Sequence, residues 1–249
     1  MNSILLICLV ALVAMMFVNN MKRIKKLQNS NGYVEAYLKI LKGDEDGEAF
    51  LNDYIEKETN DELINRAKIV KLYQDMLNGT NPINAIDEID FTKAFGQEYG
   101  ISVEEISQNS DVFIWLVMNM TKAKSMSLID VMDKLYEKVT VFEENFNKTV
   151  EYNIFKASYE LILEKSYDSK EFLFDLLEGN YTDYAYDKQL IGVFKKMAAS
   201  LLDYSGEELS EEYEVLLKDF AVTQVGNKML KNLGTIDKFY KEEKTEEWR

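Results

Sequence analysis

Residues that interrupt helices are scarce in this chain, and their scarcity limits its fold more than any other feature. One proline and eleven glycines occur among 249 residues, so the turn signals that separate short strands are sparse. Apolar residues between the glycines recur at helical spacing. A hydrophobic content of 47% is enough to bury a core. We therefore predict an all-α fold.

An uncharged apolar run, Ile4–Val18, stands near the N-terminus and contains no Gly or Pro. As a helix its fifteen residues span about 22 Å, which is short for a hydrocarbon core of ~30 Å. No basic residue precedes the run and no small-residue cleavage pattern follows it, as a signal peptide would require. We expect residues 4–18 to form a retained transmembrane helix that contacts the membrane, with a cleaved signal as the alternative.

Four basic residues follow the apolar run directly: Lys22, Arg23, Lys25 and Lys26. Their long side chains can extend the effective span by reaching the interface. Basic flanks tend to stay in the cytoplasm, so we expect a single-pass protein of the cell membrane with its N-terminus outside and its body cytoplasmic. The alternative is a cell-envelope protein whose body lies outside.

The remainder of the chain is strongly acidic. The net charge is −15 from 29 basic and 44 acidic residues, and residues 27 onward hold 25 of the basic and all of the acidic ones. Such a body is repelled by nucleic acid and by anionic lipid. We expect no nucleic-acid partner, and a protein partner that is either basic or fitted to an apolar groove.

Residues 33–95 contain an internal similarity. A shift of 36 residues superposes five pairs: Val34 on Val70, Tyr37 on Tyr73, Leu41 on Leu77, Gly43 on Gly79, and Ala49 on Ala85. The order is helix, glycine, turn and helix in both copies, and Leu177, Gly179 and Ala185 repeat the spacing. The helix that carries Val70 and Leu77 of the second copy begins at Thr59-Asn60-Asp61, which supplies capping oxygens.

This similarity resembles the tetratricopeptide-like α-helical repeat proteins, whose unit is a helical hairpin of about this length. The family's Gly and Ala spacing is not reproduced well, and most candidate units lack its terminal Pro. The resemblance implies an α-solenoid-like stack whose concave face binds a peptide or a partner protein. Tyr37 and Tyr73 are candidate contacts on that face, with core packing as the other explanation.

We divide the chain into five parts. They are an anchor at 1–21, a basic juxtamembrane linker at 22–32, helical hairpins at 33–100, a continuing helical body at 101–240 and a charged tail at 241–249. In the body, Val112–Met118 is apolar throughout and predicts a buried core helix. Later helices are expected at Tyr152–Lys165, Lys170–Glu178, Tyr184–Tyr204 and Glu211–Lys231.

Two further features suggest contact surfaces. Apolar residues from Leu128 to Thr149 step by four and three residues over three heptads, which predicts one long helix and a possible homodimer through 128–149; an ordinary amphipathic helix is the alternative. Tyr181, Tyr184 and Tyr186 cluster beside a glycine. Tyrosines are enriched at recognition surfaces, although a loop can also pack such rings onto its own helices.

The residue inventory excludes several kinds of chemistry. The chain has no histidine, and its one cysteine, Cys8, lies in the apolar run, so histidine-based triads, His-containing zinc sites and a thiolate nucleophile are excluded. No Gly-rich phosphate loop occurs, and the acidic turn at 44–48 does not match a calcium loop. We predict no catalytic, cofactor-binding or metal site and no cofactor.

Together these features favour a membrane-anchored adaptor or scaffold that holds a partner protein at the cytoplasmic face. The alternative is a histidine-free enzyme, or enzyme subunit, that uses carboxylates in a cleft between helices. Such a cleft would hold converging carboxylates with perturbed pKa values.

Overall fold

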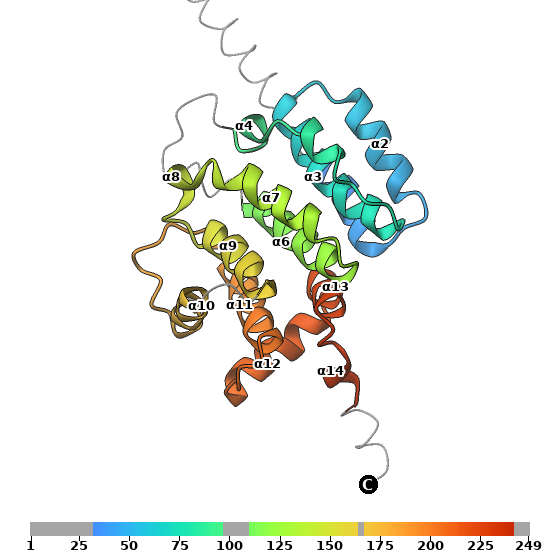
Figure 1. The fold of residues 1–249 in the computed structure, drawn as a ribbon. Coiled ribbons are helices and arrows are strands. Elements are labelled where there is room, and N and C mark those ends of the chain that lie inside the picture. The colour runs from blue at the N-terminus through green and yellow to red at the C-terminus, as the bar shows by residue number, and fades with distance from the viewer. Residues whose placement is uncertain (1–31, 97–109, 164–166, 242–249) are drawn as a thin grey trace, which may run out of the picture.

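A computed structural model describes residues 32–96, 110–163 and 167–241 (Figure 1). These residues form helices joined by turns, which confirms the predicted all-α class. Within them no strand occurs beyond an isolated parallel bridge between Thr149 and Ala185. The predicted anchor at residues 4–18 and the basic cluster Lys22, Arg23, Lys25 and Lys26 lie outside the described residues. No helix in the described part of the chain combines the length and apolarity that a bilayer crossing needs.

Helix α6 (Ser110–Ser125) is the centre of the fold. Four helices pack against it: α3 (Asp61–Leu77), α7 (Ile129–Thr140), α9 (Val150–Ile162) and α13 (Gln224–Leu233). Within Val112–Met118 every residue except Ile114 is buried, so the predicted core helix is confirmed. Because α6 is covered on several sides, its sequence is apolar nearly all round, as expected for a buried helix.

The remaining elements surround this core (Figure 1). Residues 32–42 are helical, and α2 (Gly47–Lys57) packs on α3. At the other end, α10 (Asp168–Glu178) and α11 (Ile191–Tyr204) pack on α9, and α12 (Glu211–Ala221) packs on α11 and α13. Shorter pieces connect them: η1 (Ala85–Glu88), α4 (Phe91–Ala94), α8 (Glu143–Phe146) and α14 (Asp237–Lys241).

The predicted repeat is reproduced only in its first half. Gly43 and Gly79 both end a helix with positive φ angles of 76° and 80°, a conformation that glycine adopts without strain. After Gly43 the chain enters α2, whereas after Gly79 it enters a turn and the 3-10 helix η1. The prediction of a second helical hairpin is therefore wrong.

Side chains from other helices explain why the second copy forms no second helix. The ammonium groups of Lys134 and Lys68 donate to the carbonyls of Ile83 and Glu88, at 3.0 and 2.9 Å. Pro82 has no N–H to donate. These backbone groups are thus satisfied without a helix.

The overall arrangement also differs from an open solenoid, in which each unit contacts only its neighbours in sequence. Helix α13 packs back on α6, and Lys124 at the end of α6 donates to the carbonyl of Leu233 at 3.0 Å. Asn232 reaches the hydroxyl of Tyr73, 159 residues earlier, at 3.4 Å. The chain closes on itself around α6.

Several predicted helices have different limits. The heptad segment is not one helix, because α7 ends at Thr140, α8 follows, and Thr149 is the N-cap of α9. Met132, Leu135, Val139 and Phe146 of that seam are buried inside the same chain, so in this fold they are not open to a second copy. The helix expected from Tyr184 begins only at Ile191, after a loop.

The last long helix expected, Glu211–Lys231, is broken after Ala221. The hydroxyl of Thr223 accepts from the N–H of Gly226 at 3.0 Å and starts α13. Gly226 lies so close to Phe220 that an added Cβ would be 2.0 Å from the carbonyl oxygen of Phe220. The break therefore needs both a capping hydroxyl and a glycine.

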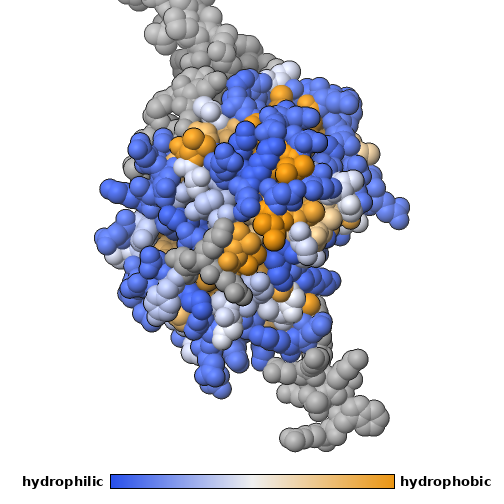
Figure 2. All heavy atoms as spheres, viewed as in Figure 1, coloured by the Kyte–Doolittle hydropathy of each residue, from blue (hydrophilic) through white to orange (hydrophobic). Residues whose placement is uncertain are grey.

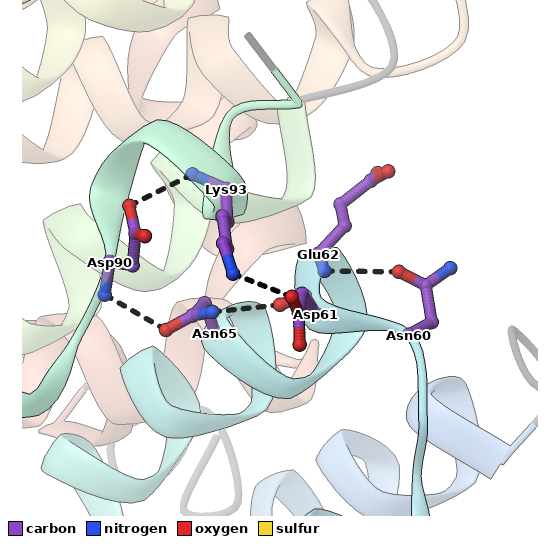
Figure 3. A network of polar contacts seen from close by, with 6 residues as sticks. All are labelled: Asn60, Asp61, Glu62, Asn65, Asp90 and Lys93. Atoms are coloured by element: carbon purple, nitrogen blue, oxygen red, sulfur yellow. Dashed lines mark hydrogen bonds and ion pairs between the residues drawn. The ribbon is translucent and has the colours of Figure 1, made fainter. Parts of the chain in front are cut away.

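The predicted cap of α3 is confirmed, and it belongs to a larger polar network (Figure 3). The side-chain oxygen of Asn60 accepts from the N–H of Glu62 at 3.0 Å. One turn on, the Asn65 amide donates to the carbonyl of Asp61 at 2.8 Å. The first bond satisfies an N–H that a helix start leaves unpaired, and the second holds the Asn65 side chain against the first turn of α3.

The same network fastens α4 to α3 (Figure 3). The oxygen of Asn65 accepts from the N–H of Asp90 at 2.8 Å, and Asp90 in turn caps α4 through the N–H of Lys93 at 3.2 Å. The Lys93 ammonium pairs with Asp61 at 2.5 Å. Every group in this network lies near the start of α3 or α4 and is bonded to another group of the protein. We therefore assign the network a structural role.

Candidate functional site

Two of the five predicted contact tyrosines lie beside the core rather than on an open face. Tyr37 and Tyr73 both pack edge-on to the ring of Trp115, with centroid distances of 6.2 and 5.6 Å. Tyr73 and Trp115 are buried, and Tyr37 is half-buried. Tyr73 is therefore not accessible to a partner, which corrects its predicted role.

The other three tyrosines belong to the loop at residues 180–190, between α10 and α11, which we call the tyrosine loop. Tyr181 and Tyr186 meet edge-on at 5.0 Å, and Tyr184 packs on Phe172 of α10 at 5.4 Å. The Lys195 ammonium of α11 lies 5.4 Å from the Tyr181 ring. The structure thus brings Tyr181 and Tyr186 together and packs Tyr184 on α10, and all three are half-buried.

A hollow of about 440 Å³ lies elsewhere, where α11, α12 and α14 meet. It is lined by Asp203, Glu207, Glu208, Leu209, Glu214, Leu217, Lys218, Lys238 and Phe239. Four carboxylates and two ammonium groups leave the lining negative. Leu209, Leu217 and Phe239 give it an apolar part, a combination found in binding pockets.

A second hollow of about 300 Å³ adjoins the first, because Glu207 lines both. Its other lining residues are Tyr167, Lys170, Glu171, Phe174, Asp175 and Glu178. It too combines carboxylates with aromatic rings. We call the two together the acidic hollows.

Ion pairs within the chain occupy part of the acidic hollows. The Lys238 ammonium of α14 pairs with Asp203 at 2.5 Å, and that of Lys170 pairs with Glu207 at 2.6 Å. Asp203 and Glu207 are therefore paired with lysines of the same chain. Glu208 and Glu214 are exposed at the rim.

Apolar surface is also present on the face shown in Figure 2, where hydrophobic residues gather near the middle of an otherwise hydrophilic surface. Ile129 and Val141, at the two ends of α7, are 55% and 75% exposed. Single exposed apolar residues are normal, so neither marks a site by itself.

The alternative of a carboxylate enzyme concerns the acidic groups of the described residues. Among them, no group of three or more acidic residues is arranged to hold a metal ion. Burial raises the pKa of the Glu151 carboxyl, but Glu151 lines neither acidic hollow.

Sequence reasoning did not find Asp203, Glu207 or Lys238. The sequence contains part of the signal for this site: Gly206 predicts a helix end, and the acidic pair Glu207-Glu208 follows it directly. Nothing in the sequence indicates that α14 folds back to place Lys238 beside Asp203, a contact across 35 positions. Comparisons with protein-family models, curated proteins and solved structures found no match to this chain.

Proposed function

We propose that this protein is a membrane-tethered helical adaptor whose acidic hollows bind a basic segment of a partner protein. Residues 4–18 would hold it in the membrane, with Lys22, Arg23, Lys25 and Lys26 at the cytoplasmic face and the helical body in the cytoplasm. The observation that carries the binding role is the mixed lining of the larger hollow, with four carboxylates beside Leu209, Leu217 and Phe239.

The partner class follows from charge and shape. A net negative hollow attracts cationic groups and repels nucleic acid and anionic lipid. Its apolar lining favours a segment in which Lys or Arg stands next to an aliphatic or aromatic residue. Lys238, already paired with Asp203, shows how an ammonium group fits there.

Crosslinking in intact cells, followed by purification through a C-terminal tag, tests this function. The chain is compared with a version lacking residues 1–21 and with the double variant Glu208→Gln and Glu214→Gln. We expect one or two proteins with basic segments, and each lost rim charge to weaken capture by about fivefold, or ~1 kcal/mol. The matched control is Glu137→Gln with Glu144→Gln, which changes two exposed carboxylates away from the hollows.

The outcomes separate the parts of the proposal. Capture that is unchanged in the Glu208/Glu214 variant would exclude the acidic hollows as the contact. Equal capture with and without residues 1–21 would mean that the body alone recognises the partner. Protease added to intact cells should leave the body uncut, and rapid digestion would instead place it outside.

A further inference from the structure

Glu151, in the first turn of α9, is a carboxyl group buried where three segments meet. Only 1% of the residue is exposed. Its Oε1 accepts from the hydroxyl of Ser110, at the start of α6, at 2.8 Å. The same oxygen accepts from the N–H of Asp187, in the tyrosine loop, at 2.9 Å. One oxygen atom thus joins the loop to two core helices.

Few other polar bonds hold the tyrosine loop to the core. The N–H of Ala185 donates to the carbonyl of Lys148 at 2.9 Å, and the N–H of Val150 donates to the carbonyl of Ala185 at 3.1 Å. Asp187 also forms part of the turn before α11, because its carboxylate accepts from the N–H of Gln189 at 2.8 Å. The Glu151 bond therefore lies between the backbone bridge and the beginning of the next helix.

The second oxygen of Glu151 is not satisfied. Oε2 is buried and has no hydrogen-bond partner. The charged group that acts on Glu151 from the loop is another acid, Asp187; from α6 it faces the neutral Ser110. Within the described residues no lysine or arginine pairs with Glu151. An ionised carboxylate with one buried, unpaired oxygen is costly, and a neutral one is less so.

We propose that Glu151 is a protonation-dependent clamp: the neutral carboxyl keeps the tyrosine loop docked, and loss of its proton favours release of the loop. In the released state the carboxylate reaches water and moves away from Asp187. The clamp controls exposure of Tyr181, Tyr184 and Tyr186, and the inference does not depend on the acidic hollows.

The direction of the pH effect follows from linkage. Burial is the largest cause that raises the pKa of Glu151, and the charge of Asp187 adds to it. Interactions with the backbone N–H groups of Glu151 itself and of Asp187 and with the Ser110 hydroxyl oppose it, and the net direction is upward. A raised folded-state pKa means that docking is fully favoured below about pH 4.3, the ordinary value for Glu. Docking is then lost as the pH rises through the raised pKa of Glu151.

Hydrogen exchange of the full-length protein in detergent micelles tests the clamp. The protection of amides in residues 180–190 is followed from about pH 5 to about pH 8, after correction for the intrinsic exchange rates. Between the ordinary Glu pKa of about 4.3 and the raised pKa, we expect protection to fall by up to about tenfold per pH unit, as one linked proton allows, and to level off above the raised pKa. In Glu151→Gln it should not vary with pH, because the amide oxygen still accepts both bonds and carries no charge.

Three further variants make the test specific. Glu144→Gln, an exposed carboxylate on α8, should keep the wild-type response. Ser110→Ala removes a hydrogen-bond donor that favours the ionised form of Glu151, so the midpoint of the loss of protection should move to higher pH. This variant tests the clamp even where Glu151→Gln does not fold. A flat wild-type profile, or a response abolished by Asp187→Asn and retained by Glu151→Gln, would overturn the proposal.

Discussion

Tyr37 and Tyr73 stand edge-on to one indole ring, that of Trp115, although 36 residues separate them in sequence. Equivalent positions of the sequence repeat thus converge on α6 from the helix at 32–42 and from α3. Edge-to-face aromatic pairs add to the free energy of burial. The shared ring explains why both copies of the repeat have a tyrosine there without any need for a partner.

Alanine substitutions at Trp115, Tyr73 and Tyr37 should lower stability in proportion to the burial of each side chain. We expect Trp115→Ala and Tyr73→Ala each to lower the free energy of unfolding by about 3–5 kcal/mol, because both side chains are buried. Tyr37→Ala should cost less, because Tyr37 is half-buried. Urea denaturation followed by circular dichroism measures this, with Tyr167→Ala, 80% exposed, as the control. Equal losses of unfolding free energy in Tyr37→Ala and Tyr73→Ala would contradict the difference in burial between the two tyrosines.

Alanine should affect stability in opposite directions at two glycines, one at the break between α12 and α13 and one in α11. Gly226→Ala should lower stability by several kcal/mol or prevent folding, because the new methyl group would overlap the Phe220 carbonyl. Gly192→Ala, in α11, meets no atom within 4 Å and should raise stability by about 0.5–1 kcal/mol. Thermal unfolding of the two variants side by side is decisive, and a tolerated Gly226→Ala would refute the close packing.

Arg66 of α3 is a buried cation with partners on three elements. Its guanidinium contacts Glu62 at 2.8 Å, Asp111 of α6 at 3.5 Å and the Ala94 carbonyl of α4 at 3.0 Å. Removing one partner of a buried charge cluster leaves the other charges buried without a counter-charge. We expect Arg66→Ala to cost about 3–5 kcal/mol in the free energy of unfolding.

Arg66→Lys is the informative control for that prediction. Lysine keeps the charge but lacks the planar fork that serves several acceptors at once. Its loss of stability should therefore lie between those of wild type and Arg66→Ala. Identical stability of the lysine variant and wild type would show that charge alone suffices.

Tyr159 provides a test at alkaline pH. Burial, with the hydrogen bond to Asp133 at 2.6 Å, raises the pKa of Tyr159 to about 12. The unfolded value is about 10, so this contribution to stability is present below about pH 10 and is lost as the pH rises toward 12. We expect tyrosinate absorbance to show part of the tyrosines ionising only as the helices unfold.

Tyr159→Phe isolates that contribution. Without the hydroxyl, alkaline unfolding should shift to higher pH, while stability near neutrality should fall by about 1 kcal/mol through loss of the bond to Asp133. Circular dichroism against pH measures both effects. An unchanged alkaline midpoint would show that Tyr159 does not contribute to it.

Local patterns predicted the helices well where neighbouring residues decide the outcome. The cap at Asn60, the glycines that end helices at residues 43 and 79, and the buried run Val112–Met118 were all predicted from spacing and residue type. The predictions of a second hairpin and of one long heptad helix were wrong. In both cases groups distant in sequence take part, such as Lys134 at the carbonyl of Ile83 and the core around Phe146.

The candidate sites divide in the same way. The tyrosine cluster at 181–186 was visible as a cluster in sequence, but its contact with Glu151 through Asp187 was not. Asp203 and Lys238 were not predicted, because each is an ordinary surface residue until α14 returns to α11. A single sequence carries no record of such pairings.

The sequence by itself determined the all-α class, the absence of histidine chemistry, the acidic body and the helix ends at Gly43 and Gly79. These depend on composition and on residues within a few positions of one another. Only the tertiary structure decided that α13 closes onto α6, that Tyr73 is buried, and that the acidic hollows and the Glu151 contact exist. These features depend on which helices meet, and that is set by the burial of apolar faces over the whole chain at once.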